Sequence, residues 1–364
     1  MSSTASPSVL LRLYLGTYTL AESRGIYSAL FNQATGEAGP VTLAVETAHP
    51  SFLAVSSDAR TLYATEESAS TVKAFAIAPD GALRPLNSGD TGGLAPCDVA
   101  VHPTAPLLFI ANYNGGSVAS FTLHPDGRIG ARATLSIHSG SSVHPNRQTA
   151  PHAHGVTLSP DGRFLLVPDL GLDHVKVYAI ALPCGSLHPH TPDAFPTAPG
   201  AGPRHAAFSR DGRHVYLINE LANTVVVARY DPAAASLTTF QTIPTLPAGW
   251  TGDSATAEIV VHPGDRFVYG SNRGHDSIAV FARDPLSGLL TLREIVPTGG
   301  SFPRNFFITP NGLWLLAGNE KSDRIAIFAL DPDTGRLFAT GRSLPAPRVA
   351  CIVATALDTA LDSR

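Results

Sequence analysis

Residues 151–170 read PHAHGVTLSPDGRFLLVPDL. An alternating run, VTLS, leads into a Pro-Asp-Gly turn at Gly162, and a second apolar run, RFLLVPD, follows. Because glycine tolerates positive φ, such a turn between two apolar runs is typical of a β-hairpin. The stretch therefore predicts two antiparallel strands, with His152 and His154 at the start of the first and facing the same side.

This hairpin recurs along the chain of 364 residues, and the recurrence decides the fold class. An anchor position in the second apolar run marks each copy, at Tyr14, Tyr63, Phe109, Leu166, Tyr216, Tyr269 and Leu316. Successive anchors are 46 to 57 residues apart. A repeat of about fifty residues is typical of propeller blades.

Each repeat contains two further runs that resemble strands. The third run reads HVKVYAI, TVKAFAI or SVASFTL, and the fourth follows a turn with glycine, as in DGALR and TGRLF. Four antiparallel strands in each of seven repeats predict an all-β, seven-bladed β-propeller. Two stacked β-sandwich domains are the alternative, but no segment between the repeats resembles a domain linker.

The two ends of the chain predict how the ring closes. The first repeat lacks an opening strand, whereas APRVACIVA, after the last repeat, begins like the opening strands of the others. We expect a strand at about 347–354 to complete the N-terminal blade, which leaves no sheet edge open. This gives a disordered tail over 1–10, a propeller over 11–355 and a C-terminal tail over 356–364, where a short helix is the alternative.

The composition excludes several classes of partner. Charged residues make up 15% of the chain, against roughly 25% in a typical protein, and the net charge is −4 with no basic block. We therefore expect neither nucleic acid nor a membrane as partner. The three cysteines fit no metal motif and predict free thiols in a reducing, cytoplasmic setting. We expect a monomer or a weak homo-oligomer.

One face of the predicted disc collects ionisable side chains. First strands begin, and second strands end, at the same face because the two strands run antiparallel. Two long segments, 138–151 and 246–257, extend this face and predict the rim of a pocket. The residues that we expect to bind substrate here are His152, His205, Arg304, Tyr113, Glu258 and Trp250.

Several motifs together resemble a known family. They are GAGPRH, YLINEL, AEIVVHP, SNRGHDSIAVF, NYNGGSVASF, PHAHGVTLSPDGRFLLVPDLG and FPRNFFITP. This set resembles the seven-bladed propeller lactonases, which include bacterial 6-phosphogluconolactonases and share their fold with a fungal carboxy-muconate cyclase. The resemblance covers about residues 11–355. It implies hydrolysis of a small anionic sugar lactone without a metal or other cofactor, and the expected substrate is 6-phosphogluconolactone.

The resemblance also implies which residues act. Carried over by motif, the catalytic positions are His154, Arg204, Glu220 and Arg273, and Arg304 matches a family motif as well. Lactone hydrolysis needs a base for water and a stabiliser for the oxyanion. We expect His154 to be the base, with Glu220 orienting it or sharing that work, while the arginines hold the anionic group and the oxyanion.

The residues leave four alternatives to a metal-free lactonase: a reactive thiol, a metal site, a cyclase and a scaffold. A reactive thiol at Cys97 is one alternative, and a metal held by His138, His144, His152 and His154 is another, although their spacing fits no metal motif. A lactonising cyclase that acts on a carboxy-muconate-type dicarboxylate is the alternative enzyme. A non-catalytic propeller scaffold is the alternative without catalysis, since a fold does not fix a function.

Overall fold

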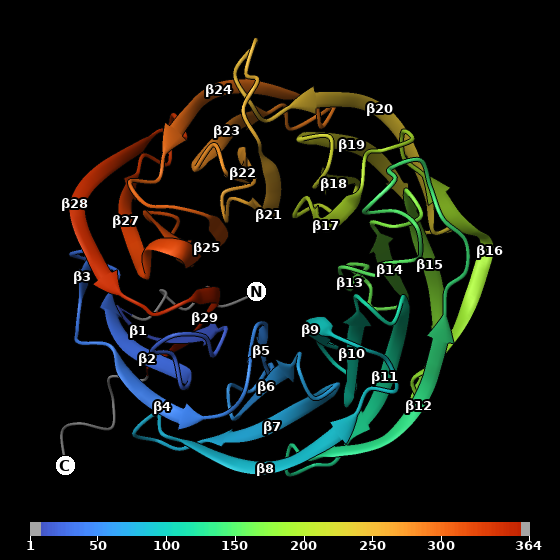
Figure 1. Cartoon of the computed structure of the whole chain (residues 1–364), viewed down its shortest axis with the longest axis horizontal. Helices are drawn as coiled ribbons and strands as arrows, with labels where there is room; N and C mark the ends of the chain where they lie inside the picture. Colours follow the sequence, from blue (N-terminus) through green and yellow to red (C-terminus); the bar gives the residue numbers. More distant parts are fainter. Residues whose placement is uncertain (1–8, 358–364) are drawn as a thin grey trace, which may run out of the picture.

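The computed structural model describes residues 9–357, and almost all of their regular structure is β-strand. The strands form seven antiparallel sheets arranged radially around a central axis, as Figure 1 shows. A short 3₁₀ helix, Glu320–Ser322, is the one helical element in this part of the chain. The predicted seven-bladed β-propeller is therefore confirmed.

Blades two to seven each contain four strands. In each blade the strand numbers rise along the chain, from the innermost strand to the outermost. Blades two to four contain β5 (Leu53–Val55), β6 (Thr61–Glu66), β7 (Thr71–Ile77), β8 (Leu83–Asp90); β9 (Pro96–Val101), β10 (Leu107–Asn112), β11 (Ser117–Leu123), β12 (Ile129–Ile137); and β13 (Thr157–Leu158), β14 (Phe164–Asp169), β15 (His174–Ala181), β16 (Ser186–Pro196). Blades five to seven contain β17 (Pro203–Phe208), β18 (His214–Asn219), β19 (Thr224–Asp231), β20 (Ser236–Pro244); β21 (Ala255–Val261), β22 (Phe267–Arg273), β23 (Ser277–Arg283), β24 (Leu290–Pro297); and β25 (Pro303–Ile308), β26 (Trp314–Asn319), β27 (Arg324–Leu330), β28 (Leu337–Pro345).

The first blade is closed by the end of the chain, as predicted. It contains β1 (Leu10–Thr17), β2 (Gly25–Asn32), β3 (Glu37–Ala38), β4 (Thr42–Glu46) and β29 (Val349–Ala356). Strand β29 pairs antiparallel with β1, in a register that runs from Leu11 opposite Ala356 to Thr17 opposite Val349.

The closing strand lies slightly further along the chain than the expected 347–354. Arg348 has a φ of 50°, so the backbone enters the strand only at Val349. Leu10 and Ala356 also belong to strands, although we expected them in the tails. The remaining parts of both predicted tails, residues 1–8 and 358–364, lie outside the described residues.

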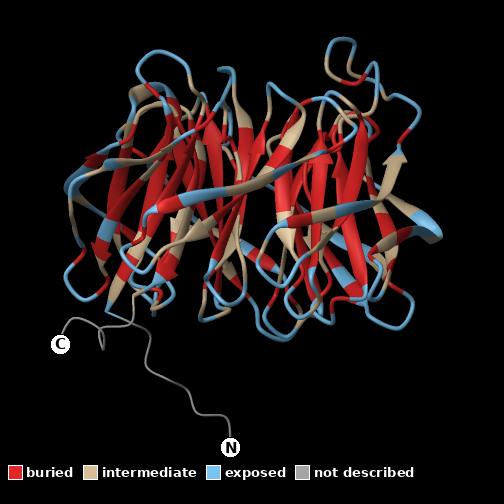
Figure 2. Cartoon of the chain, turned by 90° about the horizontal axis from the view of Figure 1, so that it is seen from below, coloured by how far each residue is buried: buried red, intermediate tan, exposed pale blue. Residues whose placement is uncertain are grey.

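The core lies between neighbouring blades. The second strand of blades two to five is buried along its whole length, because both of its faces are covered by neighbouring blades. Outer strands such as β8 and β20 are largely accessible to solvent. Figure 2 shows the same distribution, with buried strands through the middle of the disc and exposed turns at both faces.

Tyrosines at the anchor positions join successive blades at the face away from the ionisable residues. Their hydroxyls donate to glycine carbonyls in the turns between the third and fourth strands of the next blade: Tyr14 to Gly81 (3.0 Å), Tyr63 to Gly127 (2.9 Å), Tyr216 to Gly288 (3.1 Å) and Tyr269 to Gly335 (2.8 Å). These glycines have φ between 75° and 84°, which the turn requires. Trp314 donates to the Gln33 carbonyl (2.7 Å) and so joins blade seven to blade one.

Candidate active site

Four ionisable residues predicted to be catalytic come from different strands and meet at one mouth of the channel. Glu220 directly follows β18, Arg273 ends β22, and Arg204 lies in β17. His154 precedes the short strand β13. First strands begin, and second strands end, at the same face of the disc, so these side chains lie together there.

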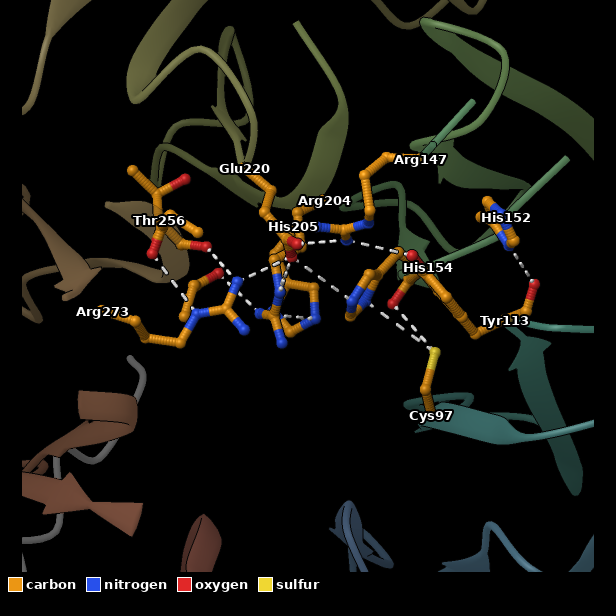
Figure 3. A network of polar contacts seen from close by, with 12 residues as sticks. Cys97, Tyr113, Arg147, His152, His154, Arg204, His205, Glu220, Thr256 and Arg273 are labelled. Carbon is orange, nitrogen blue, oxygen red and sulfur yellow. Dashed lines mark hydrogen bonds and ion pairs between the residues drawn. The ribbon is translucent and has the colours of Figure 1, made fainter. Parts of the chain in front are cut away.

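The carboxylate of Glu220 is the centre of this group (Figure 3). Its Oε2 lies 2.8 Å from Arg273 Nη2, 3.2 Å from Arg204 Nε and 3.8 Å from His154 Nε2. Its Oε1 accepts a hydrogen bond of 2.6 Å from Nη2 of Arg147. The structure thus brings together all four predicted catalytic residues and adds a fifth side chain.

The charges around Glu220 fix its protonation. Burial opposes ionisation of Glu220, but the charges of Arg273, Arg204 and Arg147 outweigh burial and hold its pKa well below the usual value. Burial also lowers the pKa of His154 well below its usual value, and the charge of Arg204 acts in the same direction. At neutral pH the site therefore contains a carboxylate and a neutral imidazole.

Arg204 and Arg273 are held in place by the backbone as well as by Glu220. Arg204 Nη1 donates to the carbonyl of Ala257 (2.6 Å), and Arg273 Nη2 donates to the carbonyl of Thr256 (2.8 Å). Burial and the charge of Arg273 lower the pKa of Arg204 to about 10, which still leaves it protonated at neutral pH. Both guanidiniums are therefore fixed cationic groups that need no rearrangement to stabilise a developing anion.

A second polar group lies beside this cluster. His205 Nδ1 lies 3.0 Å from Glu258 Oε1, and Glu258 Oε2 accepts a hydrogen bond of 2.6 Å from Asn305. The rings of His205 and His154 are 5.5 Å apart and nearly perpendicular. His205 and Glu258, which we expected to bind substrate, are thus paired with each other. They adjoin the cluster through the His154 ring and through Arg204 Nη1, which lies 3.3 Å from His205 Nε2.

Three other residues predicted to bind substrate occupy separate places. Tyr113 stacks on His152, with 4.4 Å between ring centroids, and meets His154 edge-on at 5.1 Å. The guanidinium of Arg304 lies 5.1 Å from the centroid of the Tyr18 ring. Hence Tyr113 and His152 line the His154 side of the mouth, while Arg304 belongs to a neighbouring group.

Trp250 is the predicted substrate-binding residue that lies away from the cluster around Glu220. Its ring packs edge-on against His275, with 4.5 Å between centroids, and 43% of the residue is exposed. Among the described contacts of Trp250, none reaches Glu220 or the residues bonded to it. The loop over 246–257 therefore presents this ring at the rim.

The fold and the site together invite comparison with known proteins. The family model described as the seven-bladed β-propeller lactonase matches residues 12–354. The chain belongs to this lactonase family. A 6-phosphogluconolactonase of Bacillus subtilis is 34% identical over 342 residues, which is 93% of this chain and 97% of that relative.

Solved structures of this lactonase family agree closely with the chain. A periplasmic gluconolactonase, PpgL, of Pseudomonas aeruginosa is 33% identical, with a TM-score of 0.92 over 96% of this chain and 100% of that one. A putative 6-phosphogluconolactonase of Bacteroides fragilis is 34% identical, with a TM-score of 0.90 over 98% of this chain and 99% of that one. The resemblance inferred from the motifs is confirmed.

Arg147 is the residue of this lactonase site that sequence reasoning missed. It lies in the segment 138–151, which we predicted to form part of the rim, and it is the one arginine in that segment, which has no lysine. Its Nη2 also donates to the hydroxyl of Tyr113 (3.1 Å). The signal available in the sequence was this isolated cation in a long loop beside the ionisable face.

The histidines considered as metal ligands have other partners. His138 lies between Asp169 (2.6 Å) and the hydroxyl of Tyr178 (2.9 Å), and His152 stacks on Tyr113. Across residues 9–357, no three His, Cys, Asp or Glu side chains are grouped so that they could hold a metal ion. The same part of the lactonase chain has no helix with the length and apolarity needed to cross a membrane.

Proposed function

We propose that this lactonase opens the ring of 6-phosphogluconolactone and releases 6-phosphogluconate. The observation that carries the proposal is the neutral His154 beside a Glu220 carboxylate that is shared with three guanidiniums. The relative from Bacillus subtilis, a 6-phosphogluconolactonase, and the one from Bacteroides fragilis, a putative 6-phosphogluconolactonase, support this substrate class. The reaction would serve sugar oxidation in the pentose phosphate pathway.

In the proposed mechanism, His154 activates water. The 3.8 Å between His154 Nε2 and Glu220 Oε2 exceeds a direct hydrogen bond, and it suits a water that both groups contact. The oxygen of this water attacks the lactone carbonyl carbon while Nε2 takes one of its protons. Glu220 stays ionised, orients the imidazole and stabilises the imidazolium that forms.

The buried arginines complete the reaction. Arg204 and Arg273 stabilise the oxyanion of the tetrahedral intermediate, because both cations are fixed before substrate arrives. Collapse of the intermediate breaks the bond between the carbonyl carbon and the ring oxygen. The imidazolium then returns its proton to the departing alkoxide, so His154 ends neutral and one water has been consumed.

A panel of lactones tests the proposal. Purified protein is incubated with 6-phosphogluconolactone, unphosphorylated gluconolactone and a muconolactone, and acid release is followed above the spontaneous rate. We expect the phosphorylated lactone to have the highest kcat/KM, and turnover to be unchanged by EDTA. Preference for the muconolactone would support the cyclase alternative, and loss of turnover on chelation that Zn²⁺ restores would overturn the mechanism without metal.

A further inference from the structure

We propose that Arg147 binds the phosphate of the substrate and sets the preference of this site for phosphorylated over neutral lactones. This inference rests on the proposed function and adds a specificity residue to it. Three features support it: the exposure of the Arg147 guanidinium, the positive charge of the cluster around Glu220, and the buried contacts that hold the Arg147 loop.

Arg147 is the accessible member of the three arginines around Glu220. Its side chain is 39% exposed, whereas the side chains of Arg204 and Arg273 are 3% and 7% exposed. Within the described residues, the hydrogen bonds of the Arg147 side chain all use Nη2, which donates to Tyr113 and Glu220. The N–H groups of Nη1 and Nε have no such partner there, and each can donate to an incoming anion.

The charge around Glu220 favours an anion. Three guanidiniums surround one carboxylate, and His154 is neutral because burial lowers its pKa. The group thus has two positive charges in excess. A phosphate that binds Arg147 neutralises this excess and leaves Glu220 in contact with Arg204 and Arg273.

Arg304 is a weaker candidate for the same task. Its charge interacts more strongly with Tyr18, Glu67 and Glu320 than with Glu220, and Glu320 Oε1 also forms an ion pair with Arg348 Nη2 at 2.6 Å. A phosphate at Arg304 would face two carboxylates, Glu67 and Glu320. Repulsion between like charges therefore favours Arg147 as the phosphate ligand.

The loop that carries Arg147 is fixed at its base. Its neighbour Gln148 is fully buried and donates to Asp173 Oδ1 (2.7 Å) and to the carbonyl of Leu170 (2.8 Å). Asp173 Oδ2 in turn accepts a hydrogen bond of 2.6 Å from Ser142 in the same loop. The root of the Arg147 side chain is therefore held in place while its tip remains accessible, which suits a ligand for substrate.

Arg147→Gln tests the inference, with Arg147→Lys as the conservative variant. We expect Arg147→Gln to raise KM for 6-phosphogluconolactone about 10- to 100-fold, because it removes a charged hydrogen-bond donor. The loss in kcat/KM should be at least about tenfold larger for the phosphorylated lactone than for neutral gluconolactone, which carries no phosphate. The lysine variant, which keeps a point charge, should lie between the two.

Arg128→Gln is the matched control, since Arg128 is an exposed arginine paired with one carboxylate, Asp126, away from the site. It should leave both lactones unaffected, and thermal melts should show that every variant is folded. An equal loss on both lactones, or no loss on either, would overturn the role of Arg147.

Calorimetric binding of the product separates this inference from the proposed function. Wild-type protein should bind 6-phosphogluconate more tightly than gluconate, and Arg147→Gln should abolish the difference. A wild-type protein that hydrolyses neither sugar lactone would overturn the proposed function, whatever the product binding shows. Equal binding of the two products by wild type would overturn the phosphate site, even if both lactones are hydrolysed.

Discussion

The carboxylate of Glu220 balances three guanidiniums in a buried place, so its removal should be costly. Glu220→Gln leaves those cations without their shared counter-ion, and breaking a buried ion pair costs about 3–5 kcal/mol. We expect a fall of this size in the free energy of unfolding, measured with urea. Glu66→Gln is the control: Glu66 is also buried, but it pairs with one cation, Lys73, which is 30% exposed and keeps its hydrogen bond to Thr47, so a loss of about 1 kcal/mol is expected.

A loss for Glu220→Gln no larger than that for Glu66→Gln would contradict this account of the ion cluster. Activity gives a second readout, since the same variant also removes the group that orients His154. The three guanidiniums would then repel the imidazolium that forms during the reaction, and we expect kcat to fall at least 100-fold.

The pH dependence of catalysis follows from His154. Burial lowers its pKa, so the imidazole stays neutral, and able to accept a proton, as the pH falls from 7 past the usual histidine value of about 6.5. Activity should be lost only below that value, as the pH falls through the lowered pKa. The acid limb of kcat/KM should therefore lie below pH 6.5, and His154→Gln should lower kcat by about 10²–10⁴-fold. A limb at or above pH 6.5 would contradict a buried neutral base.

For individual residues, the sequence predicts the position of site residues at strand ends, but not that of site residues in long loops. Arg204, Glu220 and Arg273 could be placed because the repeat fixes where their strands begin and end. His154 could be placed because the repeat fixes the position of its hairpin, although its strand begins only at Thr157. Arg147 could not, since the path of the segment 138–151 depends on the buried contacts of Gln148 with Asp173 and Leu170, which no repeat predicts.

Among the elements, the second strands carry the tyrosines that join the blades. Tyr269→Phe removes the hydrogen bond to Gly335 and leaves a carbonyl in the next blade without that partner. We expect a loss of about 1–2 kcal/mol in the free energy of unfolding, measured with urea. Tyr27→Phe is the control, because the Tyr27 hydroxyl accepts an exposed hydrogen bond from Arg24, and it should cost less than about 0.5 kcal/mol. Equal losses would show that the contacts between blades contribute little.

One predicted strand is much shorter than its sequence suggests. The alternation from His152 onwards predicts a strand through to Leu158, but β13 contains only Thr157 and Leu158. The reason lies in other blades: the Val156 amide donates to Asp98 Oδ2 (2.8 Å), and Gly155 packs against the Arg204 carbonyl. His152 and His154 therefore stand on irregular backbone, and they share the Tyr113 ring instead of one face of a strand.

The whole molecule depends on β29, which supplies the innermost strand of the first blade. Deletion of the chain from Val349 onwards exposes the edge of β1 and removes the buried side chains of Val349 and Ile352. We expect this truncation to abolish the cooperative thermal transition seen by circular dichroism and to leave most of the protein insoluble.

A circular permutant is the matched control for that truncation. It joins Leu357 to Leu10 by a short linker, since the two ends are adjacent, and opens the chain in the turn between β19 and β20. This protein keeps every strand pair and should melt cooperatively and stay active. Its failure would show that the order of the chain, and not closure of the ring, is what stability requires.

Closure by the final strand also has a consequence during synthesis. A ribosome adds roughly 5–20 residues per second, so the nascent chain waits for tens of seconds between the emergence of β1 and that of β29. Throughout this interval the inner edge of β1 is an open template for pairing with another nascent chain. Production of this protein should therefore be most sensitive to chaperone supply and to translation speed, even though β29 covers this edge of β1 in the finished disc.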